Sequence, residues 1–192
     1  MKVIEILKNS ADLLGLGNES ILLSTEDESK ETALLENEEI ASLFNLFKFS
    51  VRELCTNYVP VCASEEIVTQ NLTFPLGNLN NFIRTNKVLK GDELANYKIL
   101  NRNIVVEVDG VYTIEYFTYP EIASLFEEVD FLSTFSPDAL VYGLCAYYSL
   151  AHGLFAEFES FHECYIERAQ SLKELKSFTM PQRRWQWKQK NV

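Results

Sequence analysis

Glycine, proline and histidine are scarce in this chain, which has 7 Gly, 5 Pro and 2 His among its 192 residues. So few Gly and Pro leave no room for a long flexible linker. Basic residues are also outnumbered, with 17 Lys and Arg against 28 Asp and Glu, and the formal net charge is −11. Because contacts to phosphate require clustered Lys and Arg, this composition argues against non-specific binding to nucleic acid or to an anionic membrane.

Long apolar runs and paired cysteines are missing too. No segment approaches the roughly 18 uninterrupted apolar residues of a membrane-spanning helix. The first eight residues carry charges within their apolar stretch, which is unlike a signal peptide. The cysteines form no CxxC pair, and we expect four buried or half-buried thiols in a reducing cytoplasm: Cys55, Cys62, Cys145 and Cys164.

The common catalytic motifs are absent: there is no GxSxG, P-loop, GxGxxG or HExxH. His152 is placed at an expected helix end, and neither His152 nor His162 has a metal-ligating partner at i+3 or i+4, so both are interpreted as structural. Acidic pairs such as Glu127–Glu128 are interpreted as solvated surface in so acidic a chain. We therefore expect no enzyme activity, no metal and no cofactor.

Hydrophobic periodicity predicts about four helices. The first covers residues 3–14, and a long second helix covers 31–58 and ends before Pro60. Ser136, Pro137 and Asp138 form a start signal for a third helix that extends to about 152. A fourth helix is predicted over about 154–176.

Between these helices the pattern predicts five short strands, over 65–73, 82–89, 97–100, 104–108 and 111–119. Asn101-Arg102-Asn103 predicts a tight turn between the strands over 97–100 and 104–108, and Asp109-Gly110 is typical of a type I′ hairpin turn between the last two. The predicted fold class is α+β, a helical bundle interrupted by a small antiparallel β-sheet insertion. The segments are the N-terminal bundle helices (1–60), the β insertion (61–120), the C-terminal bundle helices (121–178) and an extended basic and aromatic tail (179–192).

Two features point to protein–protein contacts. The apolar face over 40–58 is broader than one helix of a small bundle requires, which suggests burial against a neighbouring subunit. The tail combines the residue types that dominate interface hot spots: Arg183, Arg184, Trp185, Trp187 and Lys188. Two other interpretations of the tail remain: the two Trp fold back onto the chain's own core, or Arg and Trp stack on nucleic acid.

The two ends of the chain also carry opposite charge. Residues 19–39 hold eight acids and one Lys, a net charge of −7, whereas residues 181–192 have a net charge of +4. Such complementarity suits head-to-tail contacts in a closed ring.

The order of elements and several short motifs resemble the small adaptor proteins of tailed phages, the tail-tubular-protein-A-like or head-completion proteins. The motifs are NYVP at 57–60, DGVYTIEY at 109–116, PDALVYGLCAYY at 137–148 and RRW at 183–185. The resemblance implies a non-catalytic subunit of a dodecameric ring in the virion neck, assembled in the host cytoplasm.

In that family the C-terminal arm grips the portal protein, which assigns portal binding here to Arg183, Arg184, Trp185 and Trp187, with Lys188 beside them. The resemblance also implies tail or nozzle proteins as partners, and DNA that passes through the ring without specific binding. No membrane is involved.

Two other functions remain open from the sequence. One is a non-catalytic binding or regulatory module that uses the β insertion to hold a peptide or small ligand. The other is a metal-dependent hydrolase built on clustered acids. It predicts a divalent-ion-dependent shift of the melting temperature, which is lost when Glu127 or Glu128 is removed.

Overall fold

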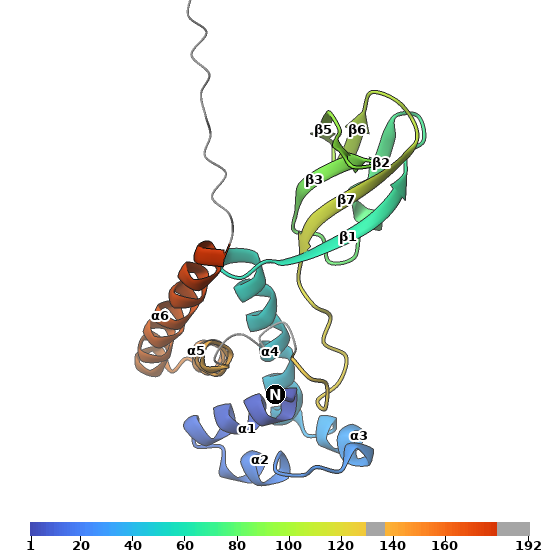
Figure 1. Cartoon of the computed structure of the whole chain (residues 1–192). Coiled ribbons are helices and arrows are strands. Elements are labelled where there is room, and N and C mark those ends of the chain that lie inside the picture. The colour runs from blue at the N-terminus through green and yellow to red at the C-terminus, as the bar shows by residue number, and fades with distance from the viewer. Residues whose placement is uncertain (130–136, 180–192) are drawn as a thin grey trace, which may run out of the picture.

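The computed structural model describes residues 1–129 and 137–179 and shows a helical unit and a β unit (Figure 1). The fold is α+β, with helices at both ends of the chain and a small antiparallel β insertion between them, as predicted. The helices are α1 (Val3–Leu13), α2 (Gly17–Leu22), α3 (Glu31–Leu35), α4 (Glu38–Asn57), α5 (Asp138–Ala151) and α6 (Phe155–Thr179). Short 3₁₀ turns lie at η1 (Glu28–Lys30) and η2 (Leu76–Asn78).

The long helix predicted over 31–58 is in fact two helices, α3 and α4, separated at Asn37. Asn37 has an extended backbone (φ −74°, ψ 117°), and its side-chain oxygen accepts hydrogen bonds from the backbone N–H groups of Glu39 (2.9 Å) and Ile40 (3.1 Å). These bonds satisfy donors that the first turn of a helix leaves free, so Asn37 begins a new helix. The prediction missed this cap because the apolar period continues across it.

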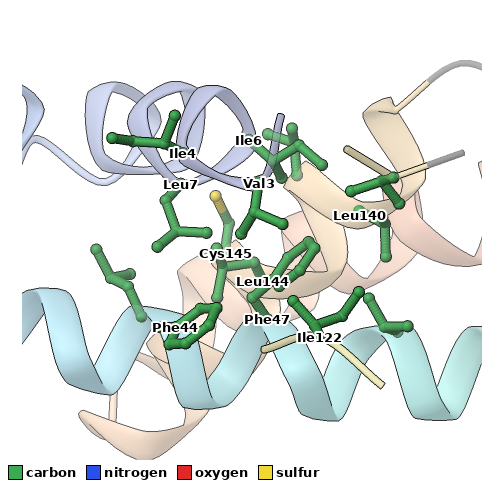
Figure 2. Close-up of a cluster of buried hydrophobic side chains, with 14 of the residues drawn as sticks. Val3, Ile4, Ile6, Leu7, Phe44, Phe47, Ile122, Leu140, Leu144 and Cys145 are labelled. Carbon is green, nitrogen blue, oxygen red and sulfur yellow. The ribbon is translucent and has the colours of Figure 1, made fainter. Parts of the chain in front are cut away.

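The core of the helical unit lies between α1, α4 and α5 (Figure 2). The apolar face of α4 is covered within the chain itself, and its buried members are at most 4% exposed: Ile40, Leu43, Phe44, Phe47, Val51, Leu54 and Cys55. The interpretation that this face needs a neighbouring subunit was therefore wrong. The side chains that cover it come from α1 and α5, which are distant in sequence from α4.

The β unit contains seven short strands in two antiparallel sheets. One sheet has the order β1 (Val61–Val68), β7 (Val111–Thr118), β3 (Arg84–Lys90) and β4 (Glu93–Leu94). The other has the order β2 (Thr73–Pro75), β6 (Asn103–Val106) and β5 (Tyr97–Leu100). Between them lies a second core, separate from that of the helices, which includes Val88, Ile104 and Ile114.

The prediction of a hairpin at Asp109-Gly110 was wrong, because β6 and β7 belong to different sheets. Asp109 instead accepts a hydrogen bond from the backbone N–H of Leu72 at 2.7 Å and so ties the connection between the sheets to the β1–β2 turn. The tight turn predicted at 101–103 is present between β5 and β6. Asn101 and Arg102 both have positive φ there, 49° and 62°.

Two stretches of chain connect the units (Figure 1). β1 follows α4 directly, and β7 leads back through residues 119–129 to the start of α1. This returning segment is part of the helical unit, since the N–H groups of Val3 and Ile4 donate to the carbonyls of Glu127 (3.0 Å) and Leu125 (2.7 Å). The joint between the two units lies beside the C-terminal half of α4.

Two further predictions concern cysteines and membranes. Among the described residues the four cysteines form no disulfide; Cys55 and Cys145 are buried and Cys164 is half-buried, but Cys62 is exposed on β1, contrary to expectation. Within residues 1–129 and 137–179, none of the helices combines the length and the apolar character needed to span a bilayer.

Candidate functional site

The tail residues assigned to partner binding lie outside the described residues: Arg183, Arg184, Trp185, Trp187 and Lys188. Ser136, the predicted cap of the third helix, also lies outside them. Pro137 stands at the N-cap position of α5, and Asp138 is in its first turn.

Both histidines take part in aromatic packing. His152 is the residue that ends α5; its ring stacks on Tyr148 at 4.1 Å, and its Nε2 lies 3.9 Å from a Glu39 oxygen. His162 lies beside Phe158 and Tyr165 on α6, with ring centroids 5.1 and 6.2 Å away. Across the part of the chain that the structure describes, no three His, Cys, Asp or Glu side chains gather as a metal site would require.

The acidic pair Glu127–Glu128 belongs to the contact between the returning segment and α1. The Glu127 side chain accepts a hydrogen bond from the N–H of Ala123 at 2.9 Å, and Glu128 forms a β-bridge with Lys2. These contacts give the pair a local role in holding the returning segment.

One unusual acid, Glu53, was not singled out from the sequence. It lies on α4, and burial raises the pKa of its carboxyl despite a hydrogen bond from the Asn57 amide (2.9 Å) and the nearby His162. Its Oε2 is buried with no hydrogen-bond partner among the described residues. Burial, together with the charge of Glu53, also raises the pKa of Tyr147 to about 12.

A basic cleft at the joint is the most distinctive surface feature near α4. It consists of two adjoining hollows of about 580 and 420 Å³ that share Arg52, Asn81 and Tyr119. The first extends along the β unit to Arg102, and the second extends along α4 to Lys48. We call this surface, with its cations Lys48, Arg52 and Arg102, the basic cleft.

The cations of the basic cleft have no carboxylate within ion-pair distance among the described residues. Arg52 lies over the Tyr119 ring at 5.3 Å, and Lys48 lies over the Phe44 ring at 4.0 Å. Glu121 also lines the second hollow but forms no ion pair there. Cations held by aromatic rings remain able to bind a carboxylate, so the cleft is suited to an acidic partner.

The sequence contains one signal for this cleft. Lys48 and Arg52 are the only basic residues between positions 31 and 83. Their i, i+4 spacing places them on one face of a helix. The third cation, Arg102, lies in a turn of the β unit, and nothing in the sequence indicates that it approaches the other two.

No protein-family model matches this chain, and no curated protein matches it.

Proposed function

We propose that this chain is a structural ring subunit of a phage head–tail connector. It docks to the portal protein through its C-terminal arm, contacts tail or nozzle proteins and further copies of itself, and forms part of the conduit for DNA. The net charge of −11 supports a conduit role, because an acidic lining repels the DNA phosphates and lets DNA slide.

The observation that carries the proposal is a group of exposed apolar side chains at the end of the β unit farthest from the helices. Val68 and Val111 are directly paired between β1 and β7, and they are 59% and 50% exposed. Val108 and Leu72 lie in the adjoining connections and are 57% and 40% exposed. Apolar residues gathered at the tip of a projecting unit are typical of a contact with another protein.

A second exposed apolar group lies on the helical unit, at the turn between α5 and α6. Leu150, Leu154 and Phe155 are 43%, 43% and 66% exposed. The proposed subunit therefore has apolar contact surfaces on both of its units, as a component held between two layers of an assembly requires.

The proposal is tested by size-exclusion chromatography with light scattering. The full chain and a chain that ends at Phe178 are each measured alone and mixed with the portal protein of the same phage. We expect only the full chain to bind the portal, because the arm with Arg183, Arg184 and Trp185 is missing from the shorter one. Two chains that both remain compact monomers and ignore the portal would contradict the proposal.

A further inference from the structure

We propose that the basic cleft of one chain binds the acidic α3–α4 junction of a second copy, head to tail. This inference rests on the proposed function and specifies the contact between neighbouring subunits. The charges involved are Lys48, Arg52 and Arg102 on one side, and Glu36 and Glu38 on the other.

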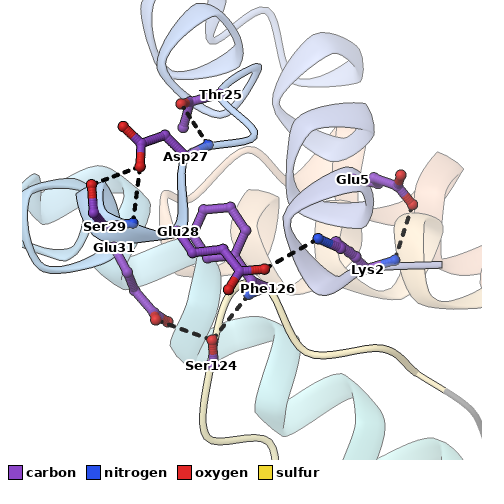
Figure 3. Close-up of polar contacts among 9 residues, drawn as sticks. All are labelled: Lys2, Glu5, Thr25, Asp27, Glu28, Ser29, Glu31, Ser124 and Phe126. Carbon is purple, nitrogen blue, oxygen red and sulfur yellow. Dashed lines mark hydrogen bonds and ion pairs between the residues drawn. The ribbon is translucent and has the colours of Figure 1, made fainter.

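Four of the eight acids in segment 19–39 are engaged within their own chain, and Figure 3 shows three of them: Asp27, Glu28 and Glu31. Glu28 pairs with Lys2 at 3.4 Å. Glu31 accepts hydrogen bonds from the Ser124 hydroxyl and the Leu125 N–H. The remaining engaged acids are Asp27, bonded to Ser29 and Lys30, and Glu39, bonded to Tyr148.

The other four acids, Glu19, Glu26, Glu36 and Glu38, form no side-chain hydrogen bond or ion pair with any described residue. Of these, Glu36 and Glu38 are both exposed and are the closest together in sequence. They flank the Asn37 cap, so their backbone positions are fixed by the start of α4. Together they form an exposed acidic surface on a fixed stretch of backbone, which we call the acidic knob.

A chain cannot place this knob in its own cleft. Glu38 and Arg52 are 14 positions apart on the single helix α4, which separates them by about 21 Å along the axis at 1.5 Å per residue. A contact between the acidic knob and the basic cleft therefore requires a second chain.

Apolar side chains accompany the charges on both sides. In the helices that precede the knob, Ile21 and Leu22 are 75% and 45% exposed and border a hollow of about 320 Å³ that Lys30 and Leu34 also line. Beside the cations, Phe49 and Ile99 line the basic cleft and are 50% and 52% exposed. The two surfaces thus match in charge, and each offers apolar area to bury.

A contact between two different surfaces of the same chain is heterologous, and repeating it produces a closed ring when the rotation closes. It therefore supplies the type of contact that a connector ring needs. Because it rests on exposed charges, the association should weaken as salt concentration rises.

The test uses two full-length variants and measures mass by light scattering at low salt, alone and on the portal. One variant has a neutral cleft (Lys48→Ala, Arg52→Ala and Arg102→Ala), and the other has a neutral knob (Glu36→Gln and Glu38→Gln). We expect the dissociation constant for self-association to rise by about tenfold or more in each variant. A 1:1 mixture should form a heterodimer and stop there, because only one of its two contacts retains both charge sets.

Matched controls neutralise Lys90 alone, or Asp92 and Glu93 together, all exposed near the β3–β4 turn, and these should assemble like the wild type. If the wild-type chain assembles and both test variants assemble equally well, the subunit contact is wrong while the proposed function stands. If the wild-type chain itself never associates, even on the portal, both are wrong. If the wild-type chain binds an oligonucleotide and only the neutral-cleft variant loses this binding, the cleft binds phosphates and the inference is overturned.

Discussion

Within the helical unit, single residues carry polar groups that the interior solvates poorly. Glu53 is half-buried on α4, Asn57 contacts one of its oxygens, and the other oxygen has no partner among the described residues. An ionised carboxylate in that position costs free energy, because desolvation outweighs the favourable contacts with Asn57 and His162.

Replacing Glu53 with Gln should therefore stabilise the protein by about 1 kcal/mol at pH 7, since the Gln oxygen still accepts the hydrogen bond from Asn57 and no charge is buried. The folded-state pKa of Glu53 lies above its ordinary value of 4.5. As the pH rises from 4.5 toward the folded-state pKa, the carboxyl of Glu53 loses its proton in the unfolded chain before it does so in the folded chain. The wild type therefore loses stability over this interval and the variant does not. The gain should disappear below about pH 4.5.

Urea denaturation at several pH values measures this effect, with Glu66→Gln on the exposed side of β1 as the control. A Glu53→Gln protein that is less stable than the wild type at pH 7 would show that the ionised carboxylate makes a favourable interaction that Gln cannot make.

At the scale of elements, caps and close packing decide where helices begin and how near they approach. The two hydrogen bonds that the Asn37 side chain accepts from the backbone N–H groups of Glu39 and Ile40 separate α4 from α3. Asn37→Ala should lower the free energy of unfolding by about 1 kcal/mol. Asn45→Ala, on the exposed side of α4, is the control and should be neutral or slightly stabilising because Ala favours the helix. Equal changes in melting temperature for the two variants would show that Asn37 does not stabilise α4 as a cap.

The contact between α5 and α6 depends on a glycine. A Cβ at Gly143 would lie 3.1 Å from Cδ2 of Tyr165, whose ring is fully buried. Gly143→Val should therefore destabilise the protein by about 2 kcal/mol through overpacking. Gly17→Ala has no atom within 4 Å of the added carbon and serves as the control. Comparable melting temperatures for the Val variant and the wild type would show that α6 can shift without cost.

For the molecule as a whole, the central property is the presence of two separate cores joined by two stretches of chain. Val61 and Thr118 are directly paired at the base of the β unit. Replacing residues 62–117 with a short Gly-rich turn should therefore leave a helical unit that still unfolds cooperatively. Circular dichroism and thermal melting check this result, and a product without cooperative unfolding would show that the helices need the β unit.

The sequence predicted the features that depend on local pattern. The first helix, the strand over 97–100 and the turn at 101–103 each depend on short-range periodicity or turn chemistry, and each is present. The hairpin at Asp109-Gly110 was wrong because strand pairing is non-local: β7 pairs with β1 and β3, far away in sequence. The basic cleft depends on the chain returning past α4 at Tyr119, which no local pattern encodes.

Negative-stain electron microscopy of the full chain mixed with the portal protein tests whether this chain is a connector ring subunit. We expect class averages in which a second ring of uniform size sits on one face of the portal, and the neutral-cleft variant should give portals with an incomplete ring or none. Bare portals beside free single chains of the full-length protein, under every salt and concentration condition, would contradict the proposed function.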